Sequence, residues 1–134
     1  MTDETRQHEP GVVTKLSPRS VGDTVERLTS LLAAKGVKVF ATIDQRAAAR
    51  AVGLDLRETV LVIFGNPAAG TPVMAAVPLA ALDLPLKVLI WDDEGQAKVT
   101  YYAPATLAAR HHLDAELAAN LAVVDPLTDA LVAP

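Results

Sequence analysis

The feature that most constrains this chain is a run of five apolar residues near its centre, residues 60–64 (VLVIF). The run shows no alternation of apolar and polar side chains, so a β-strand formed from it needs cover on both of its faces. Residues 86–91 (LKVLIW) predict a second strand of similar character. The connector between these strands is dense in Pro, Gly and Ala, and we expect the rest of the chain to pack around this unit.

Length and composition predict one globular domain. A chain of 134 residues is long enough to bury a core, and its composition, 51% hydrophobic and 21% charged, is that of a folded protein. Residues 1–10 are polar and are predicted to form a disordered tail, which leaves residues 11–134 as a single domain.

Composition and charge exclude several classes of protein. Cysteine is absent, which removes disulfides, thiolate nucleophiles and cysteine metal sites. The start of the chain lacks the apolar run of a secretory signal, and prolines and charges interrupt every candidate membrane span, so we expect a cytoplasmic protein without a membrane partner. The net charge is −4 and the basic residues are scattered, so nucleic acid is not an expected partner.

Helix and strand signals precede the central run. A short strand is expected at residues 12–15. Apolar side chains recur at helical spacing over residues 18–35, with Ser20 placed to cap the start and Gly36 placed for a left-handed end. Residues 37–43 alternate between apolar and other side chains, which predicts a strand with one apolar face.

Further elements are expected on either side of the central strands. Asp44 is placed to cap a short helix over residues 45–52. Residues 92–95 (DDEG) predict a hairpin turn, which returns the chain as a strand over residues 98–102. Helices are expected to fill the remainder of the chain.

A domain with so few helices can cover only one face of its sheet from its own chain. The simplest cover for the second face is another subunit, because closed symmetric dimers are the commonest soluble assembly. The alternative is that residues 72–82 fold back over that face. We therefore expect a homodimer, with this segment as the competing cover.

Two long motifs, FGNPAAGTPVM and PLAALDLPLKVLIWDD, resemble the family called domain of unknown function 302. The likeness also includes GVKVF at residues 36–40 and RHHL at residues 110–113, and it extends from Gly11 to the C-terminus. The resemblance implies an α/β (α+β) two-layer sandwich with a mixed β-sheet of about five strands, helices packed mainly on one face, and dimerisation.

The family's activity is not settled, so the resemblance supplies no catalytic residues. One departure matters for any mechanism. Where many relatives read Asp-His, this chain has Asp44-Gln45. An imidazole exchanges protons near neutral pH and an amide does not, so a mechanism that rests on a base at this position is in doubt here.

The turn at residues 66–72 (NPAAGTP) is the main candidate for a ligand site. It follows a buried strand and precedes an expected helix, and such turns often form ligand crevices in which backbone N–H groups attract anions. Gly70 permits close backbone approach, and Asn66 or Thr71 offers hydrogen bonds. The turn is not a phosphate-binding loop, because it lacks GxxxxGK[ST]. The alternative is that Asn66 and Thr71 cap helices.

Three ionisable residues outside the turn are also candidates for the ligand site: Asp44, Asp83 and His111. Asp44 and Asp83 form a possible acid and base pair, although helix capping and turn formation are the alternative explanation for both. His111 and His112 are adjacent, so they cannot hold one metal from the same face of a helix, and neither a metal nor a cofactor is expected. We expect instead a histidine near a helix C-terminus and Arg110 paired with an acid.

Three functional hypotheses follow from these residues. The first is a non-catalytic homodimeric module that binds a small molecule or another protein. The alternative is a small hydrolase or lyase, which requires at least three side chains of one polar cluster to converge in a cleft: Asp44, Asn66, Asp83 and His111. The third is a purely structural assembly protein, which is separated from the first by whether a concave pocket lies beside residues 66–72.

Overall fold

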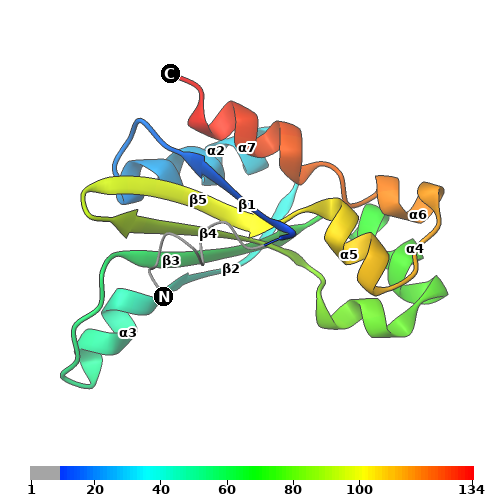
Figure 1. Cartoon of the computed structure of the whole chain (residues 1–134), viewed down its shortest axis with the longest axis horizontal. Helices are drawn as coiled ribbons and strands as arrows, with labels where there is room; N and C mark the ends of the chain where they lie inside the picture. The colour runs from blue at the N-terminus through cyan, green and yellow to red at the C-terminus, as the bar shows by residue number, and fades with distance from the viewer. Residues whose placement is uncertain (1–9) are drawn as a thin grey trace.

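The computed structural model describes residues 10–134, which form one five-stranded β-sheet with helices (Figure 1). Residues 1–9, which hold nearly all of the predicted N-terminal tail, lie outside the described part of the chain. In chain order the elements are β1 (Val12–Leu16), α2 (Val21–Ala34), β2 (Lys38–Asp44), α3 (Gln45–Ala51), β3 (Thr59–Gly65), α4 (Pro67–Ala76), the 3-10 helix η1 (Pro78–Leu82), β4 (Leu86–Asp93), β5 (Gln96–Tyr102), α5 (Pro104–Arg110), α6 (Ala115–Ala119) and α7 (Val124–Val132).

The sheet has the strand order β1-β5-β4-β3-β2, and every neighbouring pair is antiparallel. The helices α2 and α7 cover one face, while α4, α5 and α6 gather at one end of the sheet and α3 lies at the opposite end (Figure 1). The predicted fold class and strand number are confirmed. The prediction of a mixed sheet is wrong. α3 and the α4–η1 segment each return the chain at the end of the sheet where the preceding strand stops, so β2, β3 and β4 alternate in direction. The connection through α2 joins β1 and β2 at opposite edges of the sheet, where they are not neighbours.

The hydrophobic core lies between the sheet and the two covering helices. Alternate side chains of the three central strands point towards these helices and are fully buried, at 0% exposure: Val62, Phe64, Val88, Ile90 and Val99. They meet Leu28 and Leu32 of α2 and Leu127 and Leu131 of α7, each at most 1% exposed. Full burial of one such side chain contributes about 1.5–3 kcal/mol, so this layer is the main source of stability.

The opposite side of the sheet, which we call the open face, carries Leu61, Ile63, Leu89 and Trp91. These side chains are only partly buried in the described part of the chain. The segment predicted as an alternative cover, residues 72–82, leaves most of this face open, because α4 lies at the end of the sheet (Figure 1). Its last residue, Leu82, borders a hollow together with Leu61 and Leu89. The second apolar surface that the central run predicted is therefore present and is left uncovered by the described helices.

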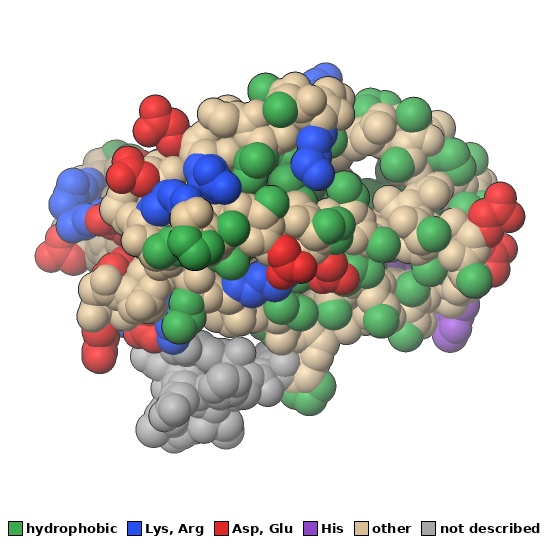
Figure 2. Space-filling model, turned by 90° about the horizontal axis from the view of Figure 1, so that it is seen from above, with side chains coloured by type: hydrophobic (Ala, Val, Ile, Leu, Met, Phe, Trp, Pro, Cys, Tyr) green, Lys and Arg blue, Asp and Glu red, His purple; other side chains and the backbone are tan. Residues whose placement is uncertain are grey.

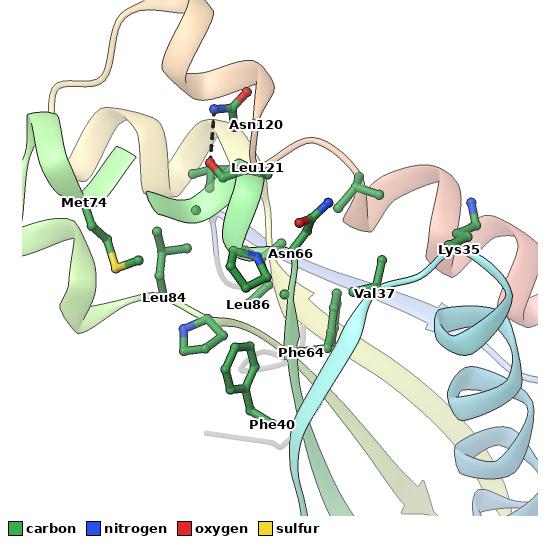
Figure 3. Close-up of a pocket in the computed structure, with 16 residues that line it drawn as sticks. Lys35, Val37, Phe40, Phe64, Asn66, Met74, Leu84, Leu86, Asn120 and Leu121 are labelled. Atoms are coloured by element: carbon green, nitrogen blue, oxygen red, sulfur yellow. Dashed lines mark hydrogen bonds between the residues drawn. The ribbon is translucent and has the colours of Figure 1, made fainter. Parts of the chain in front are cut away.

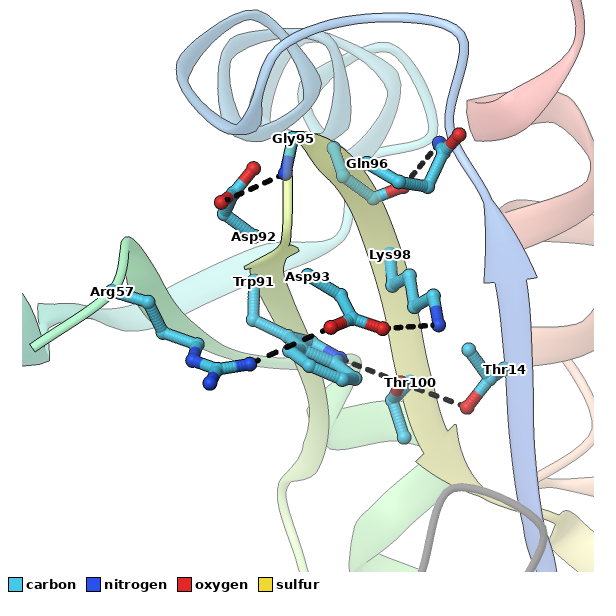
Figure 4. Close-up of polar contacts among 10 residues, drawn as sticks. Thr14, Arg57, Trp91, Asp92, Asp93, Gly95, Gln96, Lys98 and Thr100 are labelled. Carbon is cyan, nitrogen blue, oxygen red and sulfur yellow. Dashed lines mark hydrogen bonds and ion pairs between the residues drawn. The ribbon is translucent and has the colours of Figure 1, made fainter. Parts of the chain in front are cut away.

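Polar contacts frame Trp91 on the open face (Figure 4). The indole Nε1 donates a hydrogen bond to Thr100 Oγ1 at 2.9 Å. Asp93 forms ion pairs with Lys98 at 2.6 Å and with Arg57 at 3.6 Å. The open face thus combines an apolar centre with charged and hydroxyl groups that pair with one another or with Trp91.

β2 departs from its predicted pattern. It contains a bulge, because Val39 pairs with Phe64 whereas Ala41 pairs with Ile63. Cross-strand partners share a face of the sheet, so Val39 points towards the helices and Ala41 towards the open face. The expectation of a single apolar face is wrong, since the extra residue, Phe40, shifts the alternation by one position.

The capping residues predicted for α2 are confirmed, although its first residue differs from the prediction. The Ser20 side chain accepts a hydrogen bond from the backbone N–H of Asp23 at 3.1 Å, and Gly36 has the left-handed φ of +68° expected of a helix end. The helix begins at Val21 rather than at residue 18, because the backbone of Ser20 is still extended.

Candidate functional site

The turn after β3 is organised by Asn66, which caps α4. The Asn66 Oδ1 accepts a hydrogen bond from Ala68 N at 3.0 Å, and the Asn66 carbonyl accepts from Ala69 N and Gly70 N, each at 2.9 Å. The N–H groups of this first turn are therefore used within the turn. The capping alternative is confirmed for Asn66 and is wrong for Thr71, which lies inside α4. The anion site expected from free backbone donors is not formed by these groups.

A cavity of about 410 Å³ lies directly beside this turn (Figure 3). Its walls come from segments distant in sequence: the start of β2, the end of β3, α4, the start of β4 and the segment between α6 and α7. Its lining is mostly apolar and includes Val37, Phe40, Phe64, Met74, Leu84 and Leu121. Figure 2 shows a hollow bordered by hydrophobic side chains at the end of the molecule where α4, α5 and α6 lie.

Three polar side chains line the cavity, namely Lys35, Asn66 and Asn120. The Asn120 Nδ2 donates to the Ala69 carbonyl at 3.1 Å, which ties the end of α6 to α4 and closes one wall. Among the described residues that line the cavity there is no Asp, Glu or His. The site is therefore suited to holding an apolar molecule and lacks an acid–base pair.

Two of the six predicted ligand residues line the cavity, and the other four do not. Asn66 and Gly70 line the cavity, as the sequence led us to expect, whereas Thr71 is an exposed residue of α4 outside the lining. Asp44 caps α3 by accepting from Ala47 N at 2.9 Å. Because α3 and α4 lie at opposite ends of the sheet (Figure 1), Asp44 and Asn66 do not share a cleft.

Asp83 and His111 are brought together at the junction of η1 and α5. The His111 Nε2 lies 2.6 Å from an oxygen of Asp83, and Arg110 donates to the same oxygen at 3.0 Å. Partial burial by itself would raise the pKa of the Asp83 carboxyl, but the hydrogen bonds from His111 and Arg110 outweigh it, so this pKa lies below its ordinary value. The expected pairing of Arg110 with an acid, and of a histidine with a helix C-terminus, is confirmed.

The enzyme hypothesis required three of its four side chains to converge. The structure joins two, Asp83 and His111, and uses Asp44 and Asn66 as helix caps. The part of the chain that the structure describes contains no group of three or more His, Cys, Asp or Glu able to hold a metal ion. Within residues 10–134 no helix has the length and apolar character needed to cross a membrane.

Sequence reasoning missed most of the cavity lining. Phe40, Met74 and Leu84 lie within the motifs that carry the family resemblance, but that resemblance assigns no ligand-binding residues. The one available signal was Phe40, an aromatic residue at a polar position of an alternating strand, which is 45% exposed in the structure.

The features of residues 10–134 define a small α+β domain with an open antiparallel sheet, an apolar face that the described helices leave uncovered, and an apolar cavity at the end of the sheet. The chain belongs to the family described as domain of unknown function DUF302, whose profile matches residues 13–131. A similar fold occurs in the crystal structure of an uncharacterized conserved protein DUF302 from Bacillus stearothermophilus, with a TM-score of 0.78 and 22% sequence identity. That likeness covers 92% of this chain and 97% of the other and concerns the fold alone.

Three curated relatives come from Brucella, and each matches this chain over only part of its own length. The chain is 42% identical over 106 residues to Fluoride-specific ion channel FluC 1 of Brucella suis biovar 1 (strain 1330), covering 78% of this chain and 42% of the relative. The match to Fluoride-specific ion channel FluC 2 of Brucella melitensis biotype 1 also has 42% identity and covers 39% of that protein. The chain thus spans about two fifths of the length of the curated relatives it matches.

Proposed function

We propose that this chain is a non-catalytic homodimeric module that binds a small, largely apolar molecule in the cavity beside Asn66. The observation that carries this proposal is the cavity itself, about 410 Å³ with a mostly apolar lining. Pockets for small ligands typically have volumes of about 300–1,000 Å³, are mainly hydrophobic and contain a few polar groups that orient the ligand. Asn66, Asn120 and Lys35 fit that description.

The absence of a convergent catalytic group supports the non-catalytic part of the proposal. General acid–base catalysis needs a proton-transferring side chain within hydrogen-bond reach of the bound molecule. The lining residues of the cavity include amides and one lysine but no carboxylate or imidazole. The Asp83–His111 pair is occupied with joining η1 to α5, and the His111 side chain is only 9% exposed.

The open face supports the homodimeric part of the proposal. The leucine, isoleucine and tryptophan side chains of this face are exposed in part to water. Their burial against a second apolar surface lowers the free energy of the system, so association is favoured. The cytoplasmic location expected from the sequence stays a prediction.

Binding can be tested with the fluorescent apolar probe N-phenyl-1-naphthylamine and two variants at Gly70. A Cβ at this position would lie 3.8 Å from Met74 Cε, so Gly70→Ala fits, whereas the longer side chain of Gly70→Leu occupies the cavity. We expect saturable binding to the natural chain and to Gly70→Ala, and binding at least about tenfold weaker to Gly70→Leu.

Both variants should fold, because alanine and leucine are better helix formers than glycine, and thermal melting checks this. Equal binding to a folded Gly70→Leu variant, or no saturable binding to the natural chain, would contradict the proposal.

The Brucella relatives favour a second proposal, in which the domain works beside a membrane channel. It is supported by 42% identity over 78% of this chain to proteins named as fluoride-specific ion channels. The test is a chimera in which this chain replaces the matched segment of the Brucella suis protein, expressed in a fluoride-sensitive bacterium. We expect growth in sodium fluoride with the chimera and poorer growth when the segment is deleted. Equal growth after deletion would remove this proposal.

A further inference from the structure

We infer that the ligand of the cavity is a small amphipathic anion, with an apolar body inside and a negatively charged head group at Lys35. This inference rests on the proposed binding function and adds the chemical class of the ligand. It is supported by two features of the cavity lining: buried apolar side chains form the floor, and the one charged side chain among the described lining residues, Lys35, is exposed to solvent.

The floor of the cavity is formed by apolar side chains that are themselves buried. Phe64 is 0% exposed, Leu121 is 3% exposed and Leu86 is 9% exposed. Phe40, which is 45% exposed, and Met74 form parts of the wall (Figure 3). A ligand can therefore bury an aliphatic or aromatic body against these side chains, with a gain of about 25 cal/mol for each Å² of apolar surface removed from water.

The lining of the cavity carries charge of one sign. Lys35 is the one ionisable side chain among the described lining residues, and no carboxylate lines the cavity to neutralise it. Lys35 is exposed and stands at the end of α2, next to Val37 of the cavity wall (Figure 3). The turn through Gly36 fixes this position, because Val37 N donates to the Leu32 carbonyl at 2.9 Å and so holds the chain against the helix end.

A lysine ammonium acts as a compact point charge, without the planar geometry that lets arginine select a particular oxyanion. Lys35 therefore selects a negative head group rather than a particular kind of head group. The amides of Asn66 and Asn120 add neutral hydrogen-bonding groups to the lining. A neutral ligand of the same length would gain the apolar contacts but not the attraction to Lys35.

The test uses octanoate and the uncharged octan-1-ol as probes of equal chain length. The chain has two methionines, Met1 and Met74, so methionine labelled with ¹³C in its methyl group reports directly on the cavity wall by NMR. Lys35→Gln removes the charge and keeps a polar side chain that is one atom shorter. Arg50→Gln, an exposed position in the last turn of α3, is the matched control for the loss of one positive charge.

We expect both probes to shift the Met74 signal and octanoate to bind more tightly. Lys35→Gln should weaken octanoate about two- to fivefold at low salt, the range of an exposed ion pair, and leave octan-1-ol unchanged. Arg50→Gln should change neither, and added salt should reduce the preference for octanoate. Equal binding of the two probes, unaffected by Lys35→Gln, would overturn the inference and keep the proposed function. The absence of any Met74 shift with either probe would overturn both.

Discussion

The helices α2, α3 and α5 end in the same hydrogen-bonded turn, whose left-handed position is glycine in two cases and histidine in the third. After α2, α3 and α5, the residue beyond the cap is left-handed, and it is Gly36, Gly53 and His112, with φ of +68°, +76° and +52°. Around His112, the N–H of that residue donates to Ala109 and the next N–H donates to Ala108, which is the Schellman arrangement. A left-handed conformation costs an L-residue with a Cβ about 1–2 kcal/mol, so His112 carries a strain that the two glycines avoid.

Exchange of these residues should therefore act in opposite directions. His112→Gly is expected to raise the free energy of unfolding by about 0.5–1 kcal/mol, because the strain is removed and only part of it is offset by glycine entropy. Gly36→Ala is expected to lower the free energy of unfolding by about 1 kcal/mol. The added Cβ would meet no atom within 4 Å, so the loss comes from the left-handed backbone alone. Urea denaturation measures both. A loss of stability in His112→Gly would show that its imidazole makes a stabilising contact that outweighs the strain.

The Asp83 carboxylate makes stability depend on pH in a predictable direction. Its pKa in the folded chain lies below the ordinary value, because the hydrogen bonds from His111 and Arg110 outweigh the opposing effect of burial. A carboxyl with a lowered folded pKa stabilises the fold above its unfolded pKa of about 3.9, and this contribution is lost as the pH falls through the folded pKa. Asp83→Asn should therefore cost about 1 kcal/mol near pH 7 and almost nothing well below pH 3. A cost that stays constant across this range would contradict the assignment.

At the scale of elements, α7 is held to β1 by Lys15. The Lys15 ammonium donates to Thr128 Oγ1 at 2.7 Å and to the Asp125 carbonyl at 3.2 Å, and it forms an ion pair with Asp129 at 2.7 Å. Thr128 is 0% exposed, whereas the Asp129 side chain is 72% exposed. The hydrogen bond to the buried Thr128 side chain should therefore contribute more to stability than the exposed ion pair does.

This difference predicts unequal effects for two variants of the same contact. Lys15→Met keeps the apolar stem and should lower the free energy of unfolding by about 1–2 kcal/mol, because the hydrogen bonds to α7 are lost. Asp129→Asn removes only the exposed ion pair and should change it by less than about 0.5 kcal/mol. Chemical denaturation compares them, and equal losses would mean that the ion pair is the main tether.

The order of elements was predictable because local signals mark most of their ends. Ser20, Asp44 and Asp114 each accept a hydrogen bond from a backbone N–H of the helix that they begin, and a short polar side chain before an apolar periodic segment predicts this. The direction of side chains in β2 was not predictable. Its bulge at Phe40 satisfies the pairing with β3, a contact that the sequence of β2 alone does not encode.

The candidate site was predictable only where chemistry and local structure coincide. Asn66 and Gly70 were found because the turn itself has a recognisable composition. Phe40, Met74 and Leu121 come from segments far apart in the chain, and they meet only because the end of the sheet brings β2, α4 and the segment after α6 together. An apolar cavity of this kind depends on packing geometry, which a pattern of apolar residues does not specify.

At the scale of the whole molecule, the open face is the feature that the described chain leaves unpartnered. Besides its half-buried centre, it carries large apolar side chains at its edges: Leu16, Ile43 and Tyr102 are 59%, 36% and 55% exposed. A hollow of about 400 Å³, lined in part by Leu61 and Leu89, gives a projecting side chain of a partner a place to pack. An apolar centre with a charged border is the usual anatomy of a protein interface.

A second copy of the chain is the occupant that we propose for this face, and its oligomeric state is the test. Leu89 lies on β4 in the middle of the sheet, so Leu89→Glu places a charge at the centre of the interface without entering the core beneath it. Leu79→Glu, at a position that is 70% exposed in η1, makes the same chemical change away from the open face. Sedimentation from about 1 to 100 μM should show dimers for the natural chain and Leu79→Glu, and monomers for Leu89→Glu.

Thermal unfolding adds an independent measure of the same contact. Because association stabilises the folded state by mass action, the melting temperature of the natural chain should rise with its concentration, whereas that of Leu89→Glu should not. A natural chain that sediments as a monomer at every concentration, with a constant melting temperature, would contradict the homodimer. The ligand cavity lies at the end of the sheet and is lined by residues of a single chain. A monomeric protein would therefore contradict the homodimer without contradicting the proposed ligand binding.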